Sequence, residues 1–320
     1  MFGSEDLDQA ARIVYRHLAP TPQYVWPLLA RRLGTTVWVK HENHTPIGAF
    51  KVRGGLVYLA VLRARRPKIK GIVSATRGNH GQSLAYAGRA LGIRVTIVVP
   101  RGNNPEKNAA MEAFGARLVE AGEDFDAARE HAEWLAGLGE DLMAPSFHPD
   151  LVRGVATYAR ELFAAAPDLD VVYAPIGLGS GVCGLITARD LFARRVEIVG
   201  VVAERAPCYA LSLEAGRPTT TASADTVADG LAVRVPDPVA LEVMRRGLAR
   251  VVTVGEEEIR QAMRWYHSDT HNLAEGAGAA ALAAAWKERH RLRGREVAVV
   301  LSGGNVDRHT YREVLAGDER

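Results

Sequence analysis

The stretch GIVSATRGNHGQSLAYAGRALGIRVTIVV, residues 71–99, decides the fold class of this chain. It begins and ends with short runs rich in β-branched residues, 71–74 and 95–99, and a helical stretch at 82–91 lies between them. Gly92 follows this helical stretch, where a glycine commonly ends a helix. Two short apolar strands joined by a helix are typical of parallel pairing, so the segment predicts a β-α-β unit.

The same alternation of short apolar runs and helical stretches extends over most of the chain. It predicts an α/β fold with two open, mainly parallel sheets. One stretch, 205–229, has few helix or strand signals and is predicted to be a long loop, which is often functional. Further strands are predicted at 37–40, 116–119, 171–174, 197–202 and 297–301, and further helices at 107–114, 125–136, 153–163 and 256–269.

Two α/β domains are expected. The predicted division gives residues 1–52 and 148–320 to a large, cofactor-binding domain and residues 53–147 to a small α/β domain. Because ligands of open parallel sheets usually bind beyond the carboxyl ends of the strands, the site is expected in the cleft between the domains.

Composition excludes several classes of protein. The chain has 320 residues, is 48% hydrophobic and 24% charged, and carries a net charge of +3, which is too balanced to indicate a nucleic-acid or membrane-surface partner. Two cysteines, Cys183 and Cys208, do not make a disulfide scaffold. No segment has zinc-ligand spacing, a signal peptide pattern or the roughly 18 apolar residues of a membrane helix. A cytoplasmic protein without a metal site is predicted.

Lys51 stands in TPIGAFKVRGG, residues 45–55, where an extended segment is predicted to run into a helix. A helix N-terminus and burial both disfavour a charged ammonium and so lower a lysine pKa. An amine that is partly unprotonated bonds covalently to a carbonyl carbon. Lys51 is therefore a candidate catalytic residue, and Phe50 beside it is placed to stack on a ring. The alternative is a surface lysine that opens a helix.

Two loops follow predicted strands and resemble anion sites. The loop 74–82 opens a helix and offers Thr76, Asn79 and His80 as donors to a carboxylate or a phenolic oxygen; the alternative is an ordinary strand–helix turn. In GLGSG, residues 177–181, glycines let the backbone approach a phosphate and Ser180 adds a hydroxyl. The spacing differs from the dinucleotide fingerprint G-x-G-x-x-G, so one monophosphate is favoured.

Two further residues complete the candidate set. Ser302 in LSGGN, residues 301–305, is a neutral partner suited to a pyridine nitrogen, although the segment alone is a turn. Glu275 precedes an alanine-rich helix and is either its N-terminal cap or an acid of the site. A lysine amine, an anion loop, a phosphate-sized glycine loop and a terminal serine are the parts that hold pyridoxal 5'-phosphate (PLP).

These segments, in this order, resemble the fold-type II PLP-dependent enzymes, specifically the serine/threonine dehydratase family, which is related to serine racemase and phenylserine dehydratase. The resemblance extends from about residue 19 to residue 307. It implies that Lys51 is the Schiff-base lysine and general base, that Phe50 packs near the cofactor ring, and that Ser302 faces the pyridine nitrogen. It also implies a substrate-carboxylate site at Thr76, Asn79 and His80, with Asn79 on the phenolic oxygen as well, and a phosphate cradle at Gly177, Leu178, Gly179, Ser180 and Gly181.

Three features depart from the family pattern. Arg77 stands where many dehydratases have alanine and the racemases have a catalytic serine, which counts against racemisation and adds a candidate substrate-binding cation. Leu178 and Ser180 interrupt the usual glycine tetrad. Glu204 is present where some members bind a divalent metal, but the later aspartate is missing, so that metal site is expected to be weakened or absent.

The function implied by the resemblance is PLP-dependent dehydration and deamination of a β-hydroxy-α-amino acid such as L-threonine or L-serine, giving a 2-oxo acid and ammonia. Arg77 also indicates a bulkier substrate, such as 3-phenylserine or a hydroxyaspartate. The alternatives are an amino-acid racemase or β-replacement synthase on the same fold, or a non-catalytic phosphate- or nucleotide-binding protein. A homodimer is expected from the family, and an unregulated catabolic enzyme is expected because the chain ends soon after Ser302.

Overall fold

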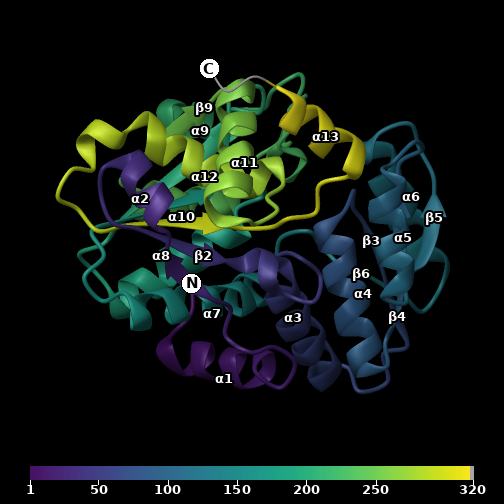
Figure 1. The fold of residues 1–320 in the computed structure, drawn as a ribbon. Coiled ribbons are helices and arrows are strands. Elements are labelled where there is room, and N and C mark those ends of the chain that lie inside the picture. Colours follow the sequence, from purple (N-terminus) through teal and green to yellow (C-terminus); the bar gives the residue numbers. More distant parts are fainter. Residues whose placement is uncertain (318–320) are drawn as a thin grey trace. The chain divides into compact units, whose positions relative to one another are not determined.

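The computed structural model describes residues 1–317, which form two compact units (Figure 1). The first unit contains Met1–Ser4, Ala19–Phe50 and the chain from Ala156 onward, and the second contains Glu5–Leu18 and Lys51–Val155. The predicted domain division differs from these units at its borders. Residues 5–18, 51–52 and 148–155 were predicted in the large domain and lie in the second unit.

A six-stranded sheet forms the core of the first unit, with strand order β1-β2-β10-β7-β8-β9. All neighbouring strands are parallel except β1 and β2, which are antiparallel. The inner strands are almost entirely buried and rich in valine, as expected for parallel strands with both faces covered. The strand bounds are β1 Gln23–Val25, β2 Val37–His41, β7 Val171–Pro175, β8 Glu197–Ala203, β9 Arg250–Val254 and β10 Val297–Leu301.

Helix α12, Gly276–Lys287, packs on strands β7 to β10 of this sheet. Its small side chains permit close approach, since a Cβ at Gly278 would lie 2.2 Å from the carbonyl oxygen of Gly303 in the turn after β10. The other helices of the first unit are α2 Pro27–Leu33, α8 Ser180–Phe192, α9 Cys208–Ala215, α10 Pro238–Gly247, α11 Glu256–Thr270 and α13 Arg308–Ala316, with 3₁₀ turns η1 Glu42–His44, η2 Asp229–Leu231 and η3 Arg289–Arg291.

The second unit is built on a parallel four-stranded sheet, order β5-β4-β3-β6. Helix α6, Phe125–Leu138, packs on β3 and β4. Helices α3, Lys51–Arg65, and α4, Asn79–Leu91, lie against each other. The remaining bounds are β3 Gly71–Ala75, β4 Arg94–Val99, β5 Arg117–Glu120, β6 Leu142–Met143, α1 Ser4–Val14 and α5 Pro105–Ala113; α7, Pro149–Ala165, runs across the border between the units.

The predicted α/β class with parallel sheets is confirmed, and each predicted strand is present. The prediction of a loop over 205–229 is wrong in part, because α9 occupies Cys208–Ala215. Strands β1, β6 and β9 were not predicted. Among residues 1–317, no helix combines the length and the apolar character needed to cross a membrane.

Candidate functional site

Lys51 is the first residue of α3, as predicted, and its side chain is half-buried. The Ser83 hydroxyl, on α4, donates a hydrogen bond of 2.5 Å to the Lys51 carbonyl oxygen. One turn along α3, a Cβ at Gly55 would lie 2.3 Å from Ser83 Oγ, so only glycine permits this approach of the two helices. Since Ser83 lies one turn after Asn79, the start of α4, these contacts hold Lys51 beside the N-terminus of α4.

His80, the second residue of α4, is buried and neutral. Its pKa is lowered to about 3, chiefly because burial disfavours the imidazolium and also because the charge of Lys51 is near. The ring hydrogen-bonds the Pro145 backbone, whereas Nε2 is buried with no hydrogen-bond partner among the described residues. Nε2 therefore presents a lone pair. A side-chain donor at His80 requires a proton on Nε2, and this role stays a prediction. Backbone N–H groups at the start of α4 are also suited to a carboxylate.

The loop between β3 and α4 is fixed by its own hydrogen bonds. The Thr76 amide donates to the Val98 carbonyl at 3.1 Å, and Thr76 Oγ1 accepts from the Gly78 amide at 3.2 Å. Asn79 begins α4 and is half-buried. The second unit thus brings Lys51, Thr76, Asn79 and His80 to one end of α4.

Two cations flank this loop. Arg77 has an exposed side chain, and its carbonyl oxygen accepts a 3.2 Å hydrogen bond from Asn103 Nδ2. Lys107, on α5, lays its aliphatic chain over the loop, since a Cβ at Gly78 would lie 3.0 Å from Lys107 Cδ. Lys107 was not predicted, because its sequence context is an ordinary helix start, and only the contact of α5 with the loop reveals it.

The glycine loop of the first unit leads into α8, which begins at Ser180. Gly179 has a φ of +103°. The Cys183 N–H donates a 2.9 Å hydrogen bond to the Gly179 carbonyl oxygen, which places the amides of 180–182 in the first turn of the helix. The N–H groups of a first turn have no hydrogen-bond partner within the helix itself. A Cβ at Gly177 would lie 2.3 Å from the Gly230 carbonyl oxygen. These are the features of an anion site at a helix N-terminus, and they fit one phosphate group.

Phe50 and Ser302 lie beside this loop in the first unit. The Phe50 amide donates to the Ser302 carbonyl oxygen at 3.0 Å, and Phe50 Cζ lies 3.4 Å from where a Cβ on Gly181 would stand. Ser302 is buried at the end of β10. Lys51 follows Phe50 in the chain, so the hydrogen bond at Phe50 anchors the segment that leads to Lys51.

Glu275 occupies the N-cap position of α12, but its side chain does not cap the helix. Its amide donates to the Gly303 carbonyl oxygen at 3.1 Å, and a Cβ on Gly303 would lie 2.5 Å from Glu275 Oε1. The carboxylate therefore lies against the turn that follows Ser302. The capping alternative is wrong, and a role as an acid of the site stays a prediction.

His41 ends β2 and pairs in register with Leu301, the residue before Ser302. Trp26 Nε1 donates to His41 Nε2 at 2.9 Å, which requires a lone pair on that nitrogen. Burial, and then the neighbouring His44, lowers the His41 pKa to about 4. His41 is therefore neutral near pH 7, and its protonation would break the bond to Trp26.

We expect the first unit to lose stability as the pH falls from 7 to 5. Because the folded-state pKa of His41, about 4, lies below the unfolded value of 6.5, its contribution is fully present above pH 6.5 and is lost as the pH falls toward 4. The loss between pH 7 and 5 is about 2 kcal/mol. Urea unfolding at both pH values measures it. His41→Gln should reduce the dependence by this amount and leave the part that comes from His80, whose pKa is also lowered. An unchanged pH dependence in that variant would contradict the assignment.

Comparison with known proteins assigns the family. Residues 14–303 match the family described as pyridoxal-phosphate dependent enzyme. The chain belongs to this family. The L-threonine ammonia-lyase of Thermotoga maritima is 32% identical over 96% of this chain and 76% of its own length. The L-threo-3-hydroxyaspartate ammonia-lyase of Saccharomyces cerevisiae is 27% identical over 98% of this chain and 96% of its own length. This chain spans only 59% of the biosynthetic L-threonine dehydratase of Haemophilus influenzae, at 30% identity.

Solved structures agree with the family. The processed form of threonine deaminase isoform 2 from Solanum lycopersicum has a TM-score of 0.91 at 29% identity, covering 99% of this chain and 95% of its own. A PLP-dependent aspartate racemase has a TM-score of 0.90 at 27% identity, covering 95% of this chain and 96% of its own. The PLP family thus includes both lyases and racemases on this fold.

The residues present fit PLP. The start of α8 suits its phosphate, Lys51 supplies an amine, and buried Ser302 supplies a hydroxyl. Over residues 1–317, no group of three or more His, Cys, Asp or Glu side chains is arranged to hold a metal ion.

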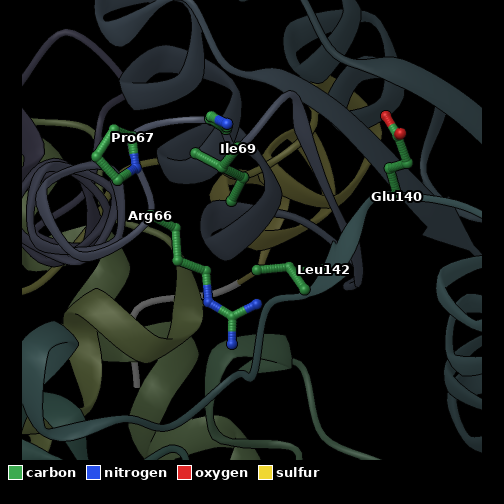
Figure 2. A pocket seen from close by; sticks show the side chains of 6 residues that line it. Arg66, Pro67, Ile69, Glu140 and Leu142 are labelled. Carbon is green, nitrogen blue, oxygen red and sulfur yellow. The ribbon is translucent and has the colours of Figure 1, made fainter.

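A separate hollow of about 450 Å³ lies in the second unit, where β3 and β6 begin (Figure 2). Figure 2 shows Arg66 and Glu140 among its labelled side chains. Thr76 and His80 follow the opposite, carboxyl end of β3, where ligands of parallel sheets bind. The hollow is therefore distinct from the candidate site. It is lined by Arg66, Pro67, Lys68, Ile69, Glu140 and Leu142.

Proposed function

We propose that this PLP enzyme is an ammonia-lyase that converts a β-hydroxy-α-amino acid into a 2-oxo acid and ammonia. The observation that carries the proposal is the position of Lys51 at the start of α3, where Ser83 holds it beside the anion loop at the start of α4. A base and a carboxylate site on one rigid pair of helices is the arrangement that α-proton removal requires.

Each residue then has a defined task. Bound PLP supplies an aldehyde for the substrate amine and an electron-accepting ring. The Lys51 amine would hold the cofactor between turnovers and would accept the α-proton, while backbone amides at Asn79 and His80 would orient the substrate carboxylate. Ser302 would serve as the neutral partner of the pyridine nitrogen. In the net reaction the β-hydroxyl leaves as water, water returns to the product, and ammonia is released.

The two cations around the loop bear on the substrate. Threonine and serine remain the default substrates, but Arg77 and Lys107 favour a substrate with a second carboxylate, such as a 3-hydroxyaspartate. The likeness to a hydroxyaspartate ammonia-lyase over nearly the whole chain supports this choice. With an aromatic substrate such as 3-phenylserine, the Arg77 guanidinium would instead stack on the phenyl ring.

A substrate panel tests the proposal. Purified holoenzyme is offered L-threonine, L-serine, 3-phenylserine and threo-3-hydroxyaspartate, and 2-oxo acid and ammonia are measured together. We expect the two products in equal amounts from at least one of these substrates. Inversion of the amino acid without release of ammonia would favour the racemase alternative. Release of neither product, with no inversion, would favour a binding protein.

Arg77→Ala should lower kcat/KM for threo-3-hydroxyaspartate by about tenfold or more relative to threonine, since a charge-assisted hydrogen bond contributes about 1.5–3 kcal/mol. Arg129→Ala is the matched control, because Arg129 is exposed on α6 of the same unit and pairs with Glu133 there. Equal ratios in wild type and Arg77→Ala would remove Arg77 from substrate selection.

We also propose a cytoplasmic homodimer, on the family resemblance alone. Sedimentation of the holoenzyme would measure the assembly state directly.

A further inference from the structure

Two buried tyrosines of the first unit, which lie on other helices, donate hydrogen bonds to the backbone of the loop 177–181. Tyr209, on α9, donates to the Leu178 carbonyl oxygen at 2.9 Å, and Tyr158, on α7, donates to the Gly181 carbonyl oxygen at 3.0 Å. Both side chains are 1% exposed. Neither residue belongs to the glycine loop or to any motif of the sequence.

The hydroxyl of Tyr209 has a fixed direction. It accepts a 2.9 Å hydrogen bond from the Asp237 amide, so its own proton goes to Leu178. Burial raises the pKa of this phenol and outweighs the opposite effect of its hydrogen bond with the Asp237 backbone, so it remains a donor throughout the physiological range. Asp237 in turn caps α10 by accepting from the amides of Val239 and Ala240. The donor is thus held by two helices, α9 and α10.

A fixed carbonyl fixes the neighbouring amide. In a trans peptide the C=O of one residue and the N–H of the next point in opposite directions, and this chain has no cis peptide bond among the described residues. Because the Leu178 carbonyl points toward the Tyr209 hydroxyl, the Gly179 amide points away from it. At the other end of the loop, the bond from Tyr158 to Gly181 holds the first turn of α8.

Tyr158 also connects the loop to Phe50. Its ring meets the ring of Phe50 edge-to-face, with centroids 6.3 Å apart and an angle of 73° between the planes. Phe50 in turn lies against Gly181 and hydrogen-bonds Ser302. One side chain therefore fixes the loop and the residue that precedes Lys51.

We propose that Tyr158 and Tyr209 are positioning residues that hold the loop 177–181 with its amides turned toward the PLP phosphate. Without the Tyr209 hydroxyl, the Leu178 carbonyl, which lies before α8, is free to turn a lone pair toward the phosphate dianion and repel it. The Tyr158 hydroxyl acts on Gly181 inside the first turn of α8 and holds that turn in place. The proposal rests on the assignment of this loop as the phosphate site. It predicts a loss of affinity specific to the phosphate group.

The test compares PLP with pyridoxal, which has no phosphate, by titrating the apoenzyme of each variant and measuring both Kd values. Tyr209→Phe and Tyr158→Phe should each raise the Kd of PLP by about three- to tenfold, the effect of losing one hydrogen bond, and leave the Kd of pyridoxal within about twofold. Tyr266→Phe is the matched control, because Tyr266 is buried in the same unit and its hydroxyl has no partner among residues 1–317. It should change neither Kd.

The outcomes separate this inference from the function itself. If wild type binds PLP no more tightly than pyridoxal, the assignment of the phosphate loop is wrong. If wild type prefers PLP and both tyrosine variants keep that preference in full, the loop assignment stands and the positioning role is overturned. Equal losses for PLP and pyridoxal would also overturn it, since they indicate a general structural effect. The Tm of each apoenzyme shows whether the variant is folded.

Discussion

Lys51→Ala should abolish turnover of every substrate and prevent covalent attachment of PLP. The alanine variant lacks both the amine that bonds the cofactor and the base for the α-proton. General-base catalysis alone contributes about 10²- to 10⁴-fold, so kcat should fall at least a thousandfold, to about the detection limit. Because Ser83 bonds the backbone of residue 51 and not its side chain, α3 should keep its place and the variant should remain folded.

The measurement has two parts that do not depend on each other. Ammonia release reports turnover, and borohydride reduction followed by peptide mass analysis reports whether PLP is attached to the peptide containing residue 51. Lys70→Ala is the control, because Lys70 is an exposed lysine of the same unit that pairs with Glu140. An added small amine should restore part of the activity of Lys51→Ala. Full activity without the amine would refute the role of this residue.

The fold could be predicted because its strands are locally distinctive. The runs at 71–75, 94–99 and 297–301 are short, mostly apolar and rich in β-branched residues. This pattern is typical of a buried parallel strand. Strand β1 was missed because Gln23–Val25 is short, largely exposed and defined only by pairing with β2. Helix α9 was missed because Cys208, Tyr209 and Ser212 are weak helix formers, and tertiary packing decides their conformation.

The site was only partly predictable, because some of its contacts depend on tertiary packing and not on local sequence. Motifs at Lys51, 74–82, 177–181 and 301–305 are contiguous and can be recognised from spacing. Tyr209 lies 31 positions from Leu178, and Tyr158 lies 23 positions from Gly181, so no local pattern reports their bonds. His80 shows the same dependence on packing. Its position beside Asn79 at a helix start suggests a hydrogen-bond donor. Burial, however, keeps its ring neutral, so one of the two ring nitrogens carries a lone pair instead of a proton.

Gly179→Ala should weaken PLP binding by about 30-fold or more. A non-glycine residue at a φ of +103° costs about 1–3 kcal/mol, and the new Cβ would lie 2.6 Å from Met244 Cε and 2.8 Å from Ala240 Cβ. Met244 is flexible enough to move aside, but Ala240 is fixed in α10, so relief must come from the loop. Overpacking of this kind costs about 1–3 kcal/mol more. The loop amides would then leave the positions that favour a phosphate.

Gly34→Ala separates backbone strain from damage to the loop. Gly34 has a φ of +71° at the end of α2, and a Cβ there would meet nothing within 4 Å. An alanine at position 34 has the same kind of backbone strain in the same unit, but its Cβ meets no neighbouring atom. The Tm of the apoenzyme should therefore fall, while the Kd of PLP stays within about twofold of wild type. If Gly179→Ala also left the PLP affinity within that range, the phosphate would have to bind elsewhere, because no arrangement of an alanine at this position preserves both the loop and its contact with α10.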